Sequence, residues 1–90
     1  MRNRFILEND QTSDMIIVAE PEACELRLAK NEQVLITDDY DQSPVVIRVT
    51  SSPTGEPVLS VWPGDGDVRI EKNGVDILDI VQQTSNARSA

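Results

Sequence analysis

Histidine is absent from this chain of 90 residues, and cysteine occurs once, as Cys24. Without histidine the chain lacks the base of a Ser-His-Asp triad or a Cys-His pair, and it lacks the usual nitrogen ligand of zinc and non-haem iron sites. One cysteine excludes an intrachain disulfide and a four-cysteine zinc or iron–sulfur centre. The phosphate-binding motifs GxGxxG and GxxxxGK[ST] are also missing. We therefore expect a protein that is not an enzyme and that uses no cofactor.

Aromatic residues are scarce, since Phe5, Tyr40 and Trp62 are the only three. The core must therefore be built from valine, isoleucine and leucine, a composition that favours pleated strands.

In the stretch that ends at Trp62, alternation places Leu59 and Val61 on one face and Trp62 on the other. We expect Trp62 at the rim of the domain, either half-buried or facing a partner, because tryptophan is enriched at the energetic centres of interfaces.

Basic residues are half as numerous as acidic ones, eight against sixteen, which gives a formal charge of −8. Such a chain is repelled by nucleic-acid phosphates and by anionic membrane surfaces, so we expect neither as a partner. The segment from Phe5 to Leu26 holds six acidic residues and no basic one. It fits either a solvated leader or a surface that docks on a basic protein, and the sequence leaves both open.

Long apolar runs are absent as well. The longest covers residues 15–19, far below the ~20 residues that a membrane-spanning helix requires. Residues 5–7 follow two arginines, as at the start of a signal peptide. However, that apolar stretch ends at Glu8, short of the roughly 7–15 residues of a signal-peptide core. We therefore expect no membrane span and a cytoplasmic location.

Residues 14–81 are predicted to form a single β domain, between a flexible N-terminal tail at 1–13 and a disordered C-terminal tail at 82–90. The pattern of apolar segments and turn residues predicts six to seven short strands, at 15–19, 24–28, 33–37, 45–50, 58–62, 67–72 and 75–80. Strands at intervals of about ten residues are typical of a small antiparallel β-sandwich or a barrel, and alternation alone does not separate the two.

One segment allows two assignments. A helix over residues 21–30 could begin with Pro21 at its first position. We prefer a strand, because Cys24, Leu26 and Leu28 alternate with charged residues and would share one face. On that face Cys24 is predicted to be a buried structural thiol.

The last two predicted strands flank the dipeptide Asn73-Gly74, which suits the two central positions of a type I′ turn. A two-residue loop sets the register, with Lys72 opposite Val75 and Ile70 opposite Ile77. The pair of isoleucines then marks the buried face of this hairpin. A short helical end over residues 75–81 is the alternative, because four apolar residues lie close together there, Ile77, Leu78, Ile80 and Val81.

Two acidic loops, at residues 38–41 and 65–67, are the remaining candidates for a site. Oxygen-rich loops of this kind can bind Ca²⁺, although neither follows the EF-hand pattern. One hypothesis is therefore a small-molecule or Ca²⁺-binding β-barrel that uses both loops as ligands. The alternative is that the first loop belongs to a protein-binding surface, together with the rim tryptophan; its residues are Asp38, Asp39, Tyr40, Asp41 and Trp62.

The segment 45–50 has one charge, Arg48, in six residues and is the strongest β-branched run of the chain. Such a strand invites aggregation if it lies at an open sheet edge. We expect it to be central in a sheet or covered by another subunit, which makes a homodimer plausible. Our leading hypothesis is a non-catalytic interaction or accessory module that binds a protein partner, basic if it meets the acidic surface, through that surface or a sheet edge.

Overall fold

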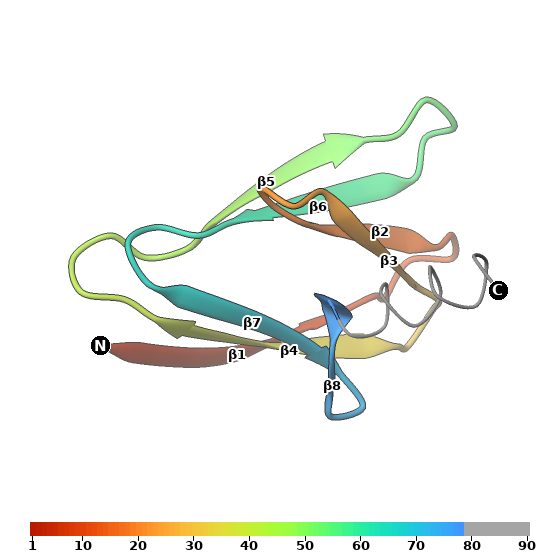
Figure 1. The fold of residues 1–90 in the computed structure, drawn as a ribbon. Helices are drawn as coiled ribbons and strands as arrows, with labels where there is room; N and C mark the ends of the chain where they lie inside the picture. Colours follow the sequence, from red (N-terminus) through yellow and green to blue (C-terminus); the bar gives the residue numbers. More distant parts are fainter. Residues whose placement is uncertain (79–90) are drawn as a thin grey trace, which may run out of the picture.

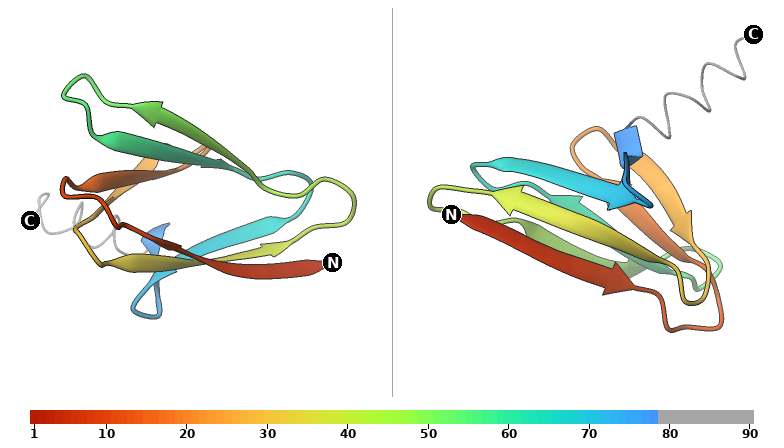
Figure 2. Two further views of the ribbon diagram at one scale, coloured as in Figure 1. Left: turned by 180° about the vertical axis from the view of Figure 1, so that it is seen from behind. Right: turned by 90° about the horizontal axis from the view of Figure 1, so that it is seen from below.

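In a computed structural model, which describes residues 1–78, the chain folds into two four-stranded β-sheets that lie face to face (Figures 1 and 2). Within these residues the eight strands are β1 (Arg2–Glu8), β2 (Met15–Ala19), β3 (Cys24–Leu28), β4 (Gln33–Asp39), β5 (Val46–Ser51), β6 (Pro57–Trp62), β7 (Asp67–Lys72) and β8 (Val75–Asp76). Sheet A has the strand order β1-β4-β7-β8, and sheet B has the order β3-β2-β6-β5. The predicted all-β fold is confirmed, as a sandwich with eight strands instead of six to seven. The tail predicted at 82–90 lies outside the described residues.

The additional strand is β1, in the segment predicted to be a tail. It pairs with β4 along its whole length, from Arg2 opposite Asp39 to Glu8 opposite Gln33. Phe5 packs against the core, as does Leu7 further along the strand. The prediction of a tail over residues 1–13 is therefore wrong for β1. The apolar run in this segment, residues 5–7, is only three residues long and does not by itself indicate a strand. The edge of β4 supplies the hydrogen bonds that make it one.

Sheet B is not fully antiparallel, because β2 and β6 run parallel, with Ile16 opposite Val58 and Ala19 opposite Val61. After β3 the chain crosses to sheet A for β4 and then returns to sheet B as the β5–β6 hairpin. On this path β6 is inserted between β2 and β5 and runs in the direction of β2. The prediction of a purely antiparallel fold is wrong here, since alternation in a strand is the same for both kinds of pairing.

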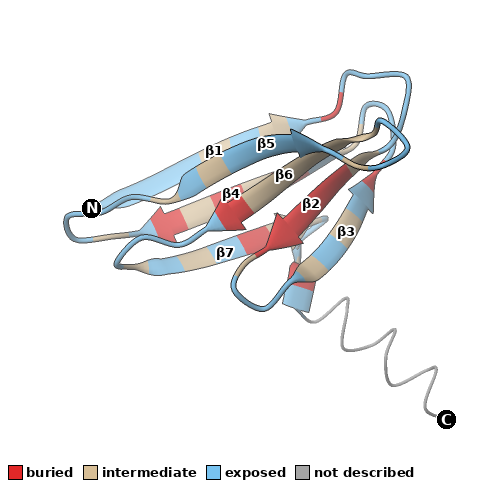
Figure 3. Ribbon diagram, turned by 90° about the horizontal axis from the view of Figure 1, so that it is seen from above, coloured by how far each residue is buried: buried red, intermediate tan, exposed pale blue. Residues whose placement is uncertain are grey.

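The core lies between the two sheets, where Figure 3 shows the buried positions gathered on the central strands. Its buried members are Ile17, Ala19, Leu28, Val34, Ile36, Val61, Ile70 and Ile77. The segment around Cys24 forms strand β3 and not a helix, and Cys24 and Leu26 are half-buried against this core. No helix within residues 1–78 has the length and apolar character needed to cross a bilayer.

The predicted hairpin is confirmed in its turn geometry and in the register next to the turn. However, β8 ends at Asp76, short of the predicted strand at 75–80, so Ile70 and Ile77 do not form the predicted cross-strand pair. Asn73 and Gly74 both have positive φ, at 53° and 82°, as a type I′ turn requires. Lys72 lies opposite Val75. Ile70 and Ile77 are both buried in the core.

Candidate functional site

The first two residues of the predicted acidic loop, Asp38 and Asp39, are the end of strand β4, and Asp38 faces inward. Asp38 is fully buried, since it shares the inner face of β4 with Val34 and Ile36. Its Oδ2 accepts the backbone N–H of Val45 at 2.8 Å, and its Oδ1 has no hydrogen-bond partner within residues 1–78. Asp38 therefore fixes the start of the segment that leads to β5 and offers no surface to a partner. The alternation of Val34, Ile36 and Asp38 was visible in the sequence.

The second acidic loop is bound to the first. The carboxylate of Asp65 accepts three backbone N–H groups, from Gln42 at 2.8 Å, Asp41 at 2.9 Å and Ser43 at 3.0 Å. These hydrogen bonds, from Gln42 first and then Asp41, hold the pKa of Asp65 below its ordinary value. The loops come this close because Gly64 has no side chain; a Cβ there would lie 1.8 Å from the carbonyl oxygen of Ser43.

This geometry bears on the Ca²⁺ hypothesis. Loops 38–41 and 65–67 lie next to each other, but the contact between them joins the carboxylate of Asp65 to backbone N–H groups. Both oxygens of Asp65 are engaged in it. Within residues 1–78 no group of three or more His, Cys, Asp or Glu residues is arranged to hold a metal ion. The two loops therefore stabilise each other, and they do not form the candidate site.

The other predicted partner-binding residues are partly accessible. Asp39 is exposed and forms an ion pair with Arg2 at 3.7 Å. Tyr40 is half-buried, and its backbone N–H donates to the carbonyl of Met1 at 2.9 Å. Asp41 is exposed, and Trp62 is 40% exposed at the end of β6, as expected for a rim residue. Asp39 thus has a basic neighbour on one side, while Asp67 of β7 lies opposite it on the other.

Strand β5 is the most unusual exposed feature of the molecule. It is the last strand of sheet B, so the expectation of a central position for 45–50 is wrong. Val46 is 60% exposed and Val49 is 68% exposed. Among residues 1–78 no strand pairs with the outer edge of β5. The segment was expected to be either central in a sheet or covered by another subunit, and only the second expectation remains.

The register shows which backbone groups point out from this edge. The N–H of Ser52 donates to the carbonyl of Glu56 at 2.8 Å, so this pair is hydrogen-bonded at the end of the β5–β6 ladder. Hydrogen-bonded and non-bonded pairs alternate along an antiparallel ladder. Ile47, Val49 and Ser51 therefore direct their N–H and C=O groups away from β6, toward the open edge.

Two further observations support this alternation. Ser51 lies opposite Pro57, which has no N–H to donate. Ile47 lies opposite Val61, whose carbonyl accepts the N–H of Glu20 and so points to the β2 side of β6. Both are non-bonded positions of the β5–β6 ladder, as the pattern demands.

The other sheet edges carry the charges that commonly protect an edge from pairing. Strand β1 has Arg2, Arg4 and Glu8, and β3 has Glu25 and Arg27 in five residues. Strand β8 is two residues long within the described part of the chain. Strand β5 has a single charge and no proline in six residues. It is the least protected of the four edges.

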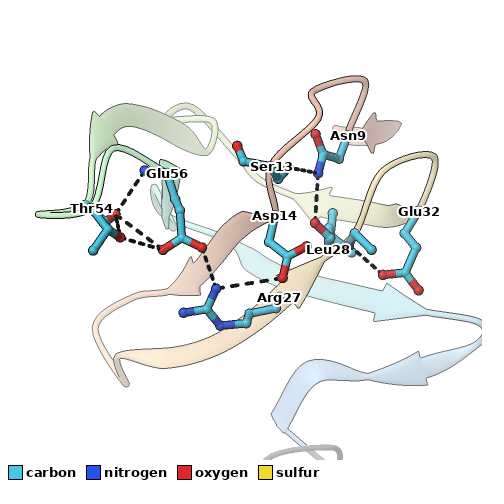
Figure 4. A network of polar contacts seen from close by, with 10 residues as sticks. Asn9, Ser13, Asp14, Arg27, Leu28, Glu32, Thr54 and Glu56 are labelled. Atoms are coloured by element: carbon cyan, nitrogen blue, oxygen red, sulfur yellow. Dashed lines mark hydrogen bonds and ion pairs between the residues drawn. The ribbon is translucent and has the colours of Figure 1, made fainter.

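The outer face of sheet B differs between its two ends. At one end Arg27, opposite Ile16 on β2, reaches Glu56 at 2.7 Å and Asp14 at 3.9 Å (Figure 4). The hydrogen bond from Arg27 lowers the pKa of Glu56. Ile16 is buried although it points to this outer face. At the other end Val46 and Trp62 are cross-strand partners, and both are exposed. An apolar pair thus adjoins the open β5 edge.

A cavity of about 190 Å³ opens between the sheets at the other side of β6. It is lined by the apolar residues Val61, Ile70 and Ile77 and by acidic residues that include Asp67 and Asp76. Asp76 is already engaged, by Arg69 at 3.4 Å and by the N–H of Leu78. Pockets that bind small molecules are usually about 300–1,000 Å³, so this cavity is small for that purpose.

The candidate site is therefore the β5 edge, defined by the outward backbone groups of Ile47, Val49 and Ser51 and the adjoining Val46–Trp62 pair. The sequence drew attention to the segment and to Trp62, but it did not show which residues have outward N–H groups. Comparisons with known proteins add nothing to this assignment, since no family model, no curated protein and no solved structure matches the chain.

Proposed function

We propose that this domain is a non-catalytic protein-interaction module that binds an extended segment of a partner along β5, as a fifth strand of sheet B. The observation that carries the proposal is an unprotected six-residue edge with alternating outward N–H and C=O groups. In strand addition the main-chain hydrogen bonds supply affinity, and neighbouring side chains supply specificity.

The charge distribution supports the same surface. Between residues 42 and 64 the chain has only two charged residues, Arg48 and Glu56, although sixteen acids are present in the whole sequence. Glu56 is neutralised locally by Arg27. The β5–β6 hairpin is therefore a neutral region on a strongly acidic protein, and a partner can approach it without first overcoming the repulsion that the rest of the surface exerts on acidic chains.

The apolar pair of Val46 and Trp62 can make this edge selective for the side chains of the partner segment. Val46 and Trp62 lie side by side on the outer face of sheet B. A residue of the added strand that points to this face would lie next to Val46. Large, half-exposed tryptophans often dominate interface energies, so we expect a preference for apolar or aromatic partner residues there.

A labelled sample and a short strand-forming peptide test this proposal. The probe is a peptide of alternating threonine and valine with lysines at both ends, added to ¹⁵N-labelled protein and followed by NMR. We expect the largest amide shifts at Ile47, Val49 and Ser51. Val49→Pro removes the central outward N–H and should weaken the shifts at least tenfold, whereas Val49→Thr keeps it and should behave like the wild type. Shifts concentrated on β1 or β3, or unaffected by Val49→Pro, would contradict the proposal.

A further inference from the structure

We infer that the segment bound at this edge is β5 of a second copy of this chain, paired antiparallel about a two-fold axis at Val49. The inference rests on the proposed strand addition at β5 and names its partner. Two copies of sheet B would then form one continuous sheet of eight strands.

Symmetry and the outward hydrogen-bonding groups restrict the register. In an antiparallel pair with a two-fold axis, one residue must lie opposite its own copy. With Val49 at the axis, Ile47 lies opposite Ser51 of the second copy. All three residues with outward N–H and C=O groups then lie in hydrogen-bonded pairs: 47 with 51, 49 with 49, and 51 with 47.

The competing register has Arg48 at the axis and gives an overlap of the same length. It forms only two hydrogen-bonded pairs within the strand, 47 with 49 and 49 with 47. It also places Arg48 opposite Arg48, and like charges directly opposite each other destabilise a strand pair. In the register centred on Val49, Arg48 lies opposite Thr50. Axes at Ile47 or Thr50 would pair only half of the six-residue strand.

Charge and burial favour a second copy as the partner. Two molecules with a formal charge of −8 repel each other over most of their surfaces. The β5–β6 hairpin is the neutral region through which they can meet, because Arg48 and Glu56 are its only charges. At the axis each Val49, now 68% exposed although it points to the core side of the sheet, would pack against its copy. Thr50 would give Arg48 an uncharged neighbour.

Cysteine cross-linking reads the register directly. In a Cys24→Ala background, which removes the native thiol, Val49→Cys places two thiols at the axis. The Cα atoms of a hydrogen-bonded pair are about 5.5 Å apart, within disulfide range. Arg48→Cys is the matched control: its two copies would be about 8 Å apart, beyond that range. We expect a disulfide-linked dimer from Val49→Cys under mild oxidation and at least tenfold less from Arg48→Cys.

Sedimentation velocity of the wild-type chain supplies the second readout. We expect a concentration-dependent dimer with little sensitivity to salt, and a loss of at least tenfold in dimer affinity for Val49→Pro, with the fold checked by circular dichroism. Cross-linking of Arg48→Cys in preference to Val49→Cys would overturn the register. A dimer that persists in Val49→Pro would overturn the interface. A monomer at all concentrations, with the threonine–valine peptide still shifting the β5 amides, would overturn self-pairing and leave the proposed strand addition standing.

Discussion

Replacement of Asn9 by alanine should be one of the most damaging single changes to a polar residue in this domain. Asn9 is fully buried in the loop between β1 and β2. Its Nδ2 donates to the carbonyl of Leu28 at 2.8 Å and to that of Ser13 at 3.0 Å (Figure 4). Its Oδ1 accepts the N–H of Gln11 at 2.8 Å. One side chain thus connects the loop after β1 to the end of β3 in the other sheet.

The size of the effect follows from these three hydrogen bonds. Asn9→Ala deprives the buried carbonyl of Leu28 of its side-chain donor, which costs about 1–3 kcal/mol. The two part-buried hydrogen bonds add about 0.5–1.5 kcal/mol each. We therefore expect a loss of about 2–6 kcal/mol from a free energy of unfolding that is typically about 5–15 kcal/mol. For a domain of this size that corresponds to a fall in melting temperature of roughly 10 °C or more.

Urea denaturation followed by far-ultraviolet circular dichroism measures this loss. Asp10→Ala is the matched control, because its side chain is exposed and forms no hydrogen bond within residues 1–78; its stability should stay within about 0.5 kcal/mol of the wild type. Asn9→Asp keeps an acceptor for Gln11 but turns a carboxylate oxygen toward two carbonyls, so it should be at least as unstable as Asn9→Ala. If Asn9→Ala changes stability no more than Asp10→Ala, the reasoning is refuted.

Three further predictions concern the sheet edge and the acidic loops. Thr50→Pro removes an N–H that bonds to β6 and should lower the free energy of unfolding, measured by urea denaturation, by about 1–3 kcal/mol. Val49→Pro removes an N–H that points outward and should lower it clearly less. Equal losses for the two variants would contradict the assigned alternation. Because hydrogen bonds from the loop 41–43 lower the folded-state pKa of Asp65, its contribution to stability is complete above the unfolded pKa near 4 and is lost as the pH falls further. Asp65→Asn should therefore have a lower melting temperature than the wild type at neutral pH, and it should lose less stability than the wild type as the pH falls from about 5 to about 2. The same pH dependence of stability in both proteins would count against the contact. Gly64→Ala places a Cβ 1.8 Å from a carbonyl of that loop and should cost about 1–3 kcal/mol by thermal denaturation, while a neutral effect would show that the loops separate easily.

The sequence determined the class of fold because its signals were local. The positive φ values of Asn73 and Gly74 and the register of their hairpin follow from two adjacent residues, and no distant contact is needed to specify them. The same holds for the inward face of Cys24 and Leu26, which depends only on alternation within β3. Trp62 could be assigned to the rim for the same reason.

Tertiary structure alone decided the strand pairing, and with it the candidate site. Residues 2–8 become a strand only when β4 offers its edge, and β5 becomes an edge only because β6 is inserted between it and β2. Asp38 and Asp65 looked alike as loop acids, but one is buried beneath Val45 and the other is used by three backbone N–H groups. Alternation fixes the face of a side chain within its own strand, whereas the neighbour of that strand depends on hydrogen bonds between residues distant in the sequence, which no local pattern encodes.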